Sequence, residues 1–131
     1  MANIPEGLKY TETHEWVKVE GDTVTIGITD FAQSELSDIV YIDLTALGKQ
    51  VKQTDTLGTI EAVKAVTDLY APVSGTVTES NGTLNDSPAT VNTDPYGAGW
   101  IAKMKLSKPE ELEKLLDAAA YAELARKSEH H

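Results

Sequence analysis

One lysine stands apart in the middle of the chain. Lys64 is the only lysine between Lys52 and Lys103, and runs rich in apolar and β-branched residues flank it at 56–62 and 65–70. This pattern predicts a hairpin with Lys64 at its turn. A lysine at a turn tip is exposed on a rigid scaffold, where another protein can reach its amine. The residues alone leave two interpretations open, a lysine that is modified and an ordinary surface lysine.

A second pair of residues that could do chemistry lies near the N-terminus, where His14 and Glu15 place a base beside a carboxylate. No nucleophile or metal-ligand spacing accompanies the pair, and we expect Trp16 to be buried, so a structural role is favoured for His14. The chain has no cysteine, which excludes disulfides, thiol catalysis and thiolate metal sites. We therefore expect neither an independent enzyme nor a metal site.

The charge of the chain limits its partners. Asp and Glu number 21 and Lys and Arg 11, which gives a formal net charge of -10. Nucleic acid and anionic membranes bind clustered positive charge, so neither is an expected partner. No apolar run approaches the roughly 18 residues of a membrane span, and residues 1–7 resemble neither a signal peptide nor a transit peptide. We expect a cytoplasmic monomer that docks onto basic patches of other proteins.

A mainly β fold must position these residues, because short alternating or apolar runs follow one another between turn signals. The predicted strands are residues 16–20, 23–28, 39–42, about 56–62, about 65–70, 75–78 and 100–104, with turns at 81–82 and 94–97. The first two strands should form a hairpin, and the run 39–42 should be buried on both faces. Asp30 should cap a short helix at 31–36. This spacing favours a flattened β-barrel or sandwich, with a β core at about residues 7–106.

The C-terminal region changes to a helical period. Ser107 and Glu110 match a capping box, and Pro109 falls in the first turn, where its missing N–H costs little. Apolar residues then recur every four positions, at Leu112, Leu116, Ala120 and Leu124. The pattern predicts one helix over about residues 108–127, packed by this stripe on the β core. The whole chain, residues 1–131, is predicted to be a single domain.

The segment around Lys64 resembles the attachment hairpin of lipoyl and biotinyl carrier domains, in which a lysine at a turn tip holds the cofactor through an amide. Biotin carriers usually have methionine on both sides of that lysine, whereas this chain has Val63 and Ala65. Lipoyl domains of 2-oxoacid dehydrogenases usually have aspartate where Val63 stands. The run Ile60-Glu61-Ala62-Val63-Lys64-Ala65 is similar instead to the glycine cleavage system H-protein family, which usually has serine at the position of Ala62.

Further motifs match the same family in the same order. They are residues 9–11, 14–17, 24–33, 38–40, 91–92 and 94–100, with Asn81, Leu84 and Pro88 between 38–40 and 91–92. The resemblance covers roughly residues 7–127, and Ser37 departs from it at a position where the family often has glycine. It implies a barrel-sandwich hybrid of the lipoyl-domain type, with a short internal helix and a C-terminal α-helix.

The resemblance also implies site residues. Lipoate would be attached covalently to Lys64, and Glu61, Val63 and Ala65 would serve recognition of the hairpin by a lipoate ligase or an octanoyl or lipoyl transferase. The family has a cleft beside the hairpin that shelters the loaded arm.

Aligned positions make Glu15 and Asp68 the acidic residues of this cleft, with Thr13 as a hydroxyl partner. A carboxylate there would suit the ammonium group of the loaded arm.

The implied function is that of a carrier protein and not of an enzyme. It would take the aminomethyl group of glycine from a pyridoxal-phosphate-dependent glycine decarboxylase to a tetrahydrofolate-dependent aminomethyltransferase. Dihydrolipoyl dehydrogenase would then reoxidise the dithiol. Alternatives remain open: a carrier of the same fold that serves 2-oxoacid dehydrogenases or holds biotin, an H-like lipoyl donor in lipoate relay to 2-oxoacid dehydrogenases, and an unmodified interaction module.

Overall fold

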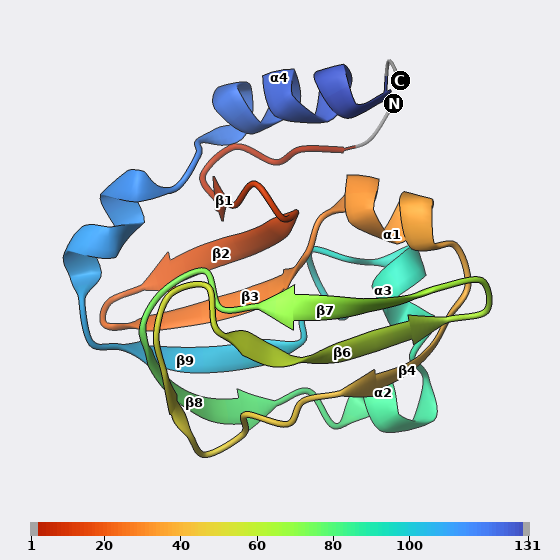
Figure 1. Cartoon of the computed structure of the whole chain (residues 1–131), viewed down its shortest axis with the longest axis horizontal. Helices are drawn as coiled ribbons and strands as arrows, with labels where there is room; N and C mark the ends of the chain where they lie inside the picture. The colour runs from red at the N-terminus through yellow and green to blue at the C-terminus, as the bar shows by residue number, and fades with distance from the viewer. Residues whose placement is uncertain (1–2, 130–131) are drawn as a thin grey trace.

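The computed structural model describes residues 3–129 and shows a mainly β protein with two antiparallel sheets (Figure 1). One sheet has six strands in the order β1-β2-β3-β9-β8-β5, and the other has three in the order β4-β6-β7. The strands are β1 (Lys9–Tyr10), β2 (Glu15–Glu20), β3 (Thr23–Ile28), β4 (Ile39–Asp43), β5 (Gln50–Val51), β6 (Thr56–Ala62), β7 (Val66–Tyr70), β8 (Gly75–Ser80) and β9 (Ala102–Leu106). The predicted mainly β, sandwich-like fold is confirmed, and within residues 3–129 the sheets do not close into a barrel. Residues 1–2 and 130–131 of the predicted domain lie outside the described residues.

The helical segments are short. They are α1 (Asp30–Leu36), α2 (Thr83–Asp86), α3 (Thr90–Thr93), the 3-10 helix η1 (Pro109–Lys114) and α4 (Ala118–Glu129). The predicted turns at 81–82 and 94–97 lie just before α2 and just after α3, and the sequence did not predict these two helices. It also placed the cap of α1 one residue late, because the Thr29 hydroxyl accepts the hydrogen bond from the Ala32 N–H at 3.2 Å. A β-region residue with a hydroxyl in this position is a favourable N-cap.

The predicted hairpin of β2 and β3 is confirmed and anchors the six-stranded sheet. Glu20 pairs with Thr23 across a turn in which Gly21 has φ +66°, a conformation that favours glycine. Gly27 on β3 lies beneath Trp16, so that a Cβ there would come 2.7 Å from the indole ring. The indole is fully buried, and its N–H donates to the Pro95 carbonyl at 2.9 Å. Trp16 therefore joins the sheet to the turn before β9.

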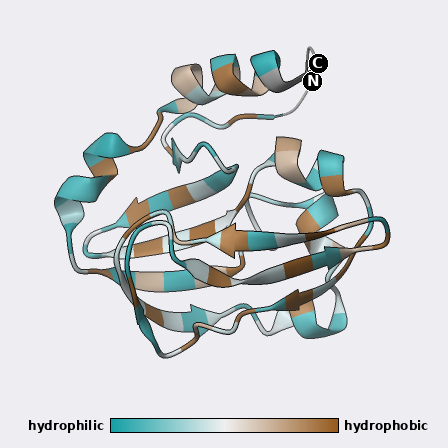
Figure 2. Ribbon diagram, in the orientation of Figure 1, coloured by the Kyte–Doolittle hydropathy of each residue, from teal (hydrophilic) through white to brown (hydrophobic). Residues whose placement is uncertain are grey.

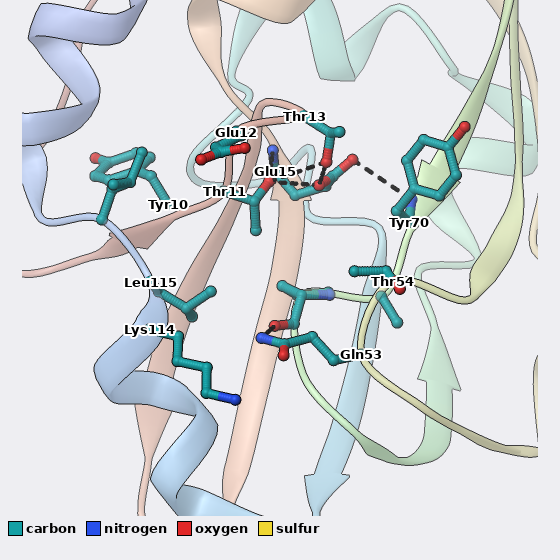
Figure 3. A pocket seen from close by; sticks show the side chains of 13 residues that line it. Tyr10, Thr11, Glu12, Thr13, Glu15, Gln53, Thr54, Tyr70, Lys114 and Leu115 are labelled. Atoms are coloured by element: carbon teal, nitrogen blue, oxygen red, sulfur yellow. Dashed lines mark hydrogen bonds between the residues drawn. The ribbon is translucent and has the colours of Figure 1, made fainter.

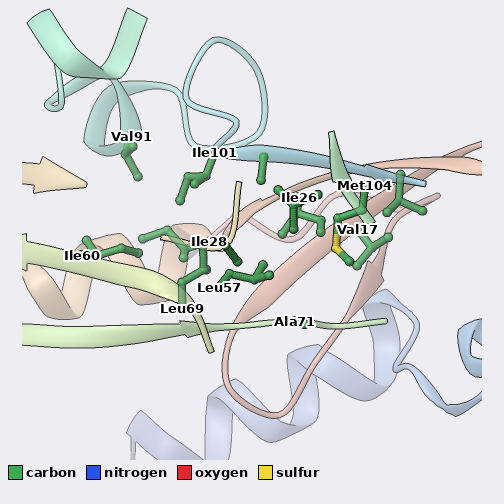
Figure 4. Close-up of a cluster of buried hydrophobic side chains, with 14 of the residues drawn as sticks. Val17, Ile26, Ile28, Leu57, Ile60, Leu69, Ala71, Val91, Ile101 and Met104 are labelled. Atoms are coloured by element: carbon green, nitrogen blue, oxygen red, sulfur yellow. The ribbon is translucent and has the colours of Figure 1, made fainter. Parts of the chain in front are cut away.

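The main core lies between the two sheets (Figure 4). Ile26 and Met104 come from the six-stranded sheet, and Leu57, Ile60 and Leu69 come from the three-stranded sheet, all of them fully buried. Burying a side chain of this size contributes about 1.5–3 kcal/mol. This core holds the β6–β7 hairpin against the six-stranded sheet.

A smaller aromatic cluster attaches the C-terminal helix. The rings of Tyr10 on β1 and Tyr121 on α4 stack with centroids 4.7 Å apart, and Trp16, Phe31 and Ala125 complete the buried cluster. Figure 1 shows α4 lying outside the β-sandwich, above β1. The helix thus packs on the β core, as expected.

The predicted helix over about residues 108–127 is nevertheless divided. Residues 115–117 interrupt it, and Leu116 pairs with Tyr10 through two backbone hydrogen bonds of 2.8 Å. Leu116 therefore belongs to a β-bridge and not to a helical stripe. A new helix starts after Asp117, whose Oδ1 accepts from the Ala120 N–H at 2.8 Å. The periodicity could not reveal this break, because the backbone of β1 supplies the competing hydrogen bonds.

The predicted capping box at Ser107 is also wrong. The residue before η1 is Lys108, with no side-chain capping hydrogen bond. The buried carboxylate of Glu111 instead turns inward and accepts from the Ser74 N–H at 2.7 Å and from the Ser74 hydroxyl at 2.9 Å. The Glu111 carboxylate therefore joins η1 to the start of β8.

The predicted burial of residues 39–42 on both faces is wrong for two of them. Val40 and Tyr41 are about half exposed, whereas Ile39 is buried. β4 is an edge strand, and its pairing with β6 shifts register between Ile39 and Tyr41. Such an irregularity breaks the strict alternation of side chains, so an apolar run need not be buried on both sides.

Candidate functional site

Lys64 lies in the turn between β6 and β7, exposed to solvent. The Ala62 N–H donates to the Ala65 carbonyl at 2.8 Å and closes this turn. The Val63 N–H donates to the Asp38 carbonyl at 2.9 Å and ties the turn to the segment between α1 and β4. The hairpin therefore presents the lysine amine on a hydrogen-bonded scaffold, with Val63 and Ala65 exposed on either side and Glu61 partly exposed on β6.

Glu15, the first residue of β2, has a side chain that is only 1% exposed. Its Oε1 accepts hydrogen bonds from the Thr11 hydroxyl at 2.5 Å and from the Thr13 hydroxyl. Its Oε2 accepts from the Tyr70 N–H of β7 at 3.4 Å (Figure 3). The carboxylate is therefore held mainly through Oε1, and its contact with β7 is long.

A tight turn positions the threonines that hold this carboxylate. The Thr11 N–H donates to the Glu15 carbonyl at 3.0 Å, the Glu15 N–H donates back to the Thr11 hydroxyl at 3.0 Å, and His14 takes φ +71°. A positive φ is uncommon outside glycine and costs about 1–3 kcal/mol. The surrounding hydrogen bonds keep the chain in this conformation, and the turn then aims the Glu15 side chain inward.

Burial raises the pKa of Glu15 to about 7, although the hydrogen bonds from Thr11, Thr13 and the Tyr70 N–H act in the opposite direction. The desolvation of the charged form therefore outweighs the hydrogen bonds that stabilise it. Near neutral pH the side chain exchanges easily between its neutral and ionised forms. A cation that arrived beside it would shift this balance toward the carboxylate.

Two hollows meet at Glu15 and Thr13, which line both of them. The hairpin-side hollow, of about 320 Å³, lies between α1 and β7 and is also lined by Phe31, Thr67 and Asp68. Because Thr67 and Asp68 follow the Lys64 turn along β7, this hollow leads from the hairpin toward the buried carboxylate.

The far hollow, of about 350 Å³, continues on the other side of Glu15 and is lined there by Gln53, Thr54 and Lys114 among others (Figure 3).

The structure brings together the three cleft residues that the sequence singled out. Thr13 donates to Glu15, and Asp68 borders the hairpin-side hollow from β7. Asp68 is exposed and accepts from the Tyr70 hydroxyl at 3.4 Å, so its environment differs from that of Glu15.

Sequence reasoning missed two contributors to this site. Thr11 could have been noticed, since it is a second hydroxyl in the short segment before Glu15, close to Thr13. Tyr70 contributes its backbone N–H, and a pattern of side chains cannot predict such a contact.

His14 takes part in a structural network. Its Nδ1 lies 2.7 Å from the Tyr121 hydroxyl, which in turn lies 2.6 Å from the Thr29 hydroxyl. Burial lowers the pKa of this histidine and favours the neutral ring. Its ring also lies 4.8 Å from that of Phe31. These contacts agree with the structural role that was expected.

Within residues 3–129, no group of three or more His, Cys, Asp or Glu side chains is arranged to hold a metal ion. In the same part of the chain, no helix has the length and apolar character needed to cross a membrane.

The fold and the site together define a class of β-sandwich domain that presents a lysine on a hairpin, beside a hollow with a buried carboxylate. The family model described as Glycine cleavage H-protein matches residues 8–128. The chain belongs to the glycine cleavage H-protein family.

Relatives with the same description match this chain over nearly its whole length. The chain is 53% identical over 121 residues to the glycine cleavage system H protein of Symbiobacterium thermophilum, covering 92% of this chain and 94% of the relative. It is 53% identical over 127 residues to that of Methylacidiphilum infernorum, covering 97% and 99%. The crystal structure of a glycine cleavage system H protein from Mycobacterium marinum matches with a TM-score of 0.83 and 39% identity, over 92% of this chain and 97% of that one.

Proposed function

We propose that this chain is a lipoyl-bearing carrier protein of the glycine cleavage system, with lipoate joined to Lys64. The observation that carries the proposal is the exposed Lys64 on a hairpin whose second strand borders a hollow ending at the buried Glu15. Family membership supports the same function. The residues fit the group, because an exposed amine can be acylated and the hollow can receive a chain attached there.

Attachment needs access to the lysine amine and no special activation by this chain. The modifying enzyme, a lipoate ligase or an octanoyl or lipoyl transferase, supplies an acyl adenylate or an acyl thioester. The new amide bond forms between Nζ and the acyl carbon, and the adenylate or thiol departs. Of the three protons of the ammonium group, Nζ keeps one as the amide N–H and gives up two to the leaving group and solvent. The formal net charge then falls by one from -10.

The cleft residues would shelter the loaded arm from water. When bound, the dithiolane supplies the thiol chemistry that this cysteine-free chain lacks, taking up the aminomethyl group of glycine. Oε2 of Glu15 would be the acceptor for the ammonium group, since Oε1 is engaged by Thr11 and Thr13 and the bond from the Tyr70 N–H to Oε2 is long, at 3.4 Å. A charge-assisted pair of this kind favours ionised Glu15. Asp68 adds negative charge at the entrance.

The proposal makes the chain a carrier and not an enzyme. Its partners would be the pyridoxal-phosphate-dependent glycine decarboxylase, the tetrahydrofolate-dependent aminomethyltransferase and dihydrolipoyl dehydrogenase, met as a cytoplasmic monomer. The acidic surface would meet basic patches on these enzymes, and added salt should weaken the encounters.

One experiment tests the central claim. Intact mass is measured after expression in a host that makes lipoate, and a lipoyl adduct is expected on the wild type and on Lys52→Arg but not on Lys64→Arg. Absence of the adduct, or biotin in its place, overturns the proposal and leaves an unmodified interaction module or a biotin carrier.

A second assay separates two lipoylated functions. The lipoylated chain should support glycine-dependent release of carbon dioxide by purified glycine decarboxylase. A lipoylated chain that fails here, and instead donates its lipoyl group to 2-oxoacid dehydrogenases, would be a relay protein.

A further inference from the structure

Exposed large apolar side chains are concentrated around the lysine hairpin. Six occur within residues 3–129: Val19 (40% exposed), Val40 (50%), Tyr41 (49%), Leu47 (47%), Val63 (74%) and Val66 (65%). Four of them, which we call the hairpin patch, lie on β4 or beside the β6–β7 turn: Val40, Tyr41, Val63 and Val66. Figure 2 shows hydrophobic stretches in both places. A cluster of exposed apolar residues next to a functional group indicates a contact surface for another protein.

The strand register brings parts of this patch together from distant positions in the sequence. Tyr41 pairs with Glu61, and Glu61 pairs with Val66, so the three side chains form one row across the sheet and point to the same face. The next row on that face is Asp43, Thr59 and Asp68. The patch is therefore apolar beside the lysine and acidic along its border.

The backbone beneath the patch is preformed. The Val63 N–H bond to Asp38 and the Ala62 N–H bond to Ala65 hold the turn against the start of β4. A partner that binds here would order few residues, which lowers the entropic cost of the contact.

The reach of the lysine decides which partner needs this surface. An unmodified lysine has only a four-carbon stem, so an enzyme that acylates Nζ must bring its own surface against the hairpin. The enzymes that use the finished carrier act on a group at the end of a much longer arm. We propose that the hairpin patch is the docking surface of the enzyme that acylates Lys64, with Tyr41 and Val40 of β4 as determinants separate from the hairpin itself.

The apolar side chains and border charges of the hairpin patch indicate the complementary surface that the partner should have. It should have an apolar groove at the mouth of its active site for Tyr41, Val40 and Val66, flanked by Lys or Arg side chains that face Glu61 and Asp43. Aromatic side chains such as Tyr41 often carry a large share of the binding energy in a contact of this kind. Rim charges of this kind mainly affect the rate of association.

The test compares matched surface substitutions in the full chain. Tyr41→Ser and Val40→Thr should each lower kcat/KM for acylation by a purified lipoate ligase, followed by intact mass, by about tenfold, the effect of losing roughly 1.4 kcal/mol of contact. Leu47→Ser and Val19→Thr remove similarly exposed side chains outside the patch and should leave the rate unchanged. All four positions are exposed, and thermal unfolding should confirm that each variant folds.

This inference rests on the proposed lipoylation, and its failure can be told apart from failure of that function. If the wild type is not acylated on Lys64, the proposed function fails. If the wild type is acylated and Tyr41→Ser is acylated equally fast, the docking surface is refuted while the function stands. A Tyr41→Ser protein that is acylated normally but, once lipoylated, fails with glycine decarboxylase assigns the patch to a different enzyme and also overturns the inference.

Discussion

The two ends of the candidate site have opposite environments. Lys64 stands in solvent at a turn with exposed neighbours, whereas Glu15 is 1% exposed and accepts hydrogen bonds from two hydroxyls and a backbone N–H. Under the proposed function, the lysine needs contact with a modifying enzyme, and the carboxylate needs separation from water. Attachment and protection would then make conflicting demands, which the chain would meet at the two ends of β7.

β7 connects these two environments. It begins at Val66 beside the lysine turn, passes Asp68 at the hairpin-side hollow and ends at Tyr70, whose N–H reaches Glu15. The hairpin-side hollow is therefore bordered by an exposed acid, Asp68, and by a buried acid, Glu15. Desolvation raises the pKa of the buried acid, Glu15, so the two ends should respond differently to substitution and to pH.

The largest expected difference is in the pH dependence of stability. Burial raises the pKa of Glu15 from 4.5 to about 7, so its folded form binds a proton more tightly than its unfolded form. The associated stability is fully present below about pH 4.5 and is lost as pH rises to about 7. The loss should reach about 3 kcal/mol.

Urea unfolding of wild type and Glu15→Gln across this range measures that loss. The variant should lack it, whereas Glu12→Gln, at an exposed neighbour, should follow the wild type. The lowered pKa of His14 makes stability rise with pH, but this contribution is common to all three proteins. If the free energies of unfolding of wild type and Glu15→Gln change with pH in parallel, ionising the buried carboxylate costs no stability.

The second expected effect concerns the loaded arm. Glu15→Gln should shorten the lifetime of the loaded, lipoylated protein in buffer by about 10- to 100-fold, because a hydrogen bond to a charged group contributes about 1.5–3 kcal/mol. Release of formaldehyde and ammonia over time is the measurement. Asp68→Asn, at the exposed end, should have a smaller effect. Equal lifetimes for Glu15→Gln and wild type would remove Glu15 from this role.

A third effect tests how the buried end is held. Thr11→Val removes a hydroxyl that donates to Glu15 and accepts from its backbone, which should lower the free energy of unfolding at pH 7 by about 1–2 kcal/mol. It should also raise the pKa of Glu15 further, as followed by carboxyl NMR shifts. Thr11→Ser keeps the hydroxyl and should behave like the wild type. If the pKa of Glu15 in Thr11→Val equals that in the wild type, the Thr13 hydroxyl alone is enough to hold the carboxylate.

The smallest effect is expected at the exposed end. Lys64→Arg should change the free energy of unfolding by no more than about 0.5 kcal/mol, because it replaces one solvated cation by another at the surface. Urea unfolding checks this value on unlipoylated protein. A larger change would mean that Lys64 supports the turn, and the contrast between the two ends would then need revision.

Short-range patterns in the sequence were sufficient for several elements. Alternation and a Gly-Asp turn predicted the β2–β3 hairpin, and the apolar runs around Lys64 predicted the β6–β7 hairpin. In both cases the strands are adjacent in the chain, so the information needed for pairing is local. The Lys64 turn followed from the same pattern.

Patterns failed where a distant segment competes for the same backbone or side chain. Leu116 fits a helical stripe, yet it pairs with Tyr10, more than a hundred residues away. Val40 and Tyr41 look like core residues, but β4 lies at the edge of its sheet with an irregular register. Exposure at a sheet edge depends on the order of strands, which no single run of residues contains.

The sequence by itself determined the β-rich character of the chain, the position of Lys64 in a hairpin turn and the family to which the chain is similar. Each depends on residue types at short or collinear spacing. Only the tertiary structure decided that Glu15 is buried, that its pKa rises and that β7 joins it to the lysine hairpin. Desolvation is set by every segment that covers a side chain, and here those segments come from both sheets.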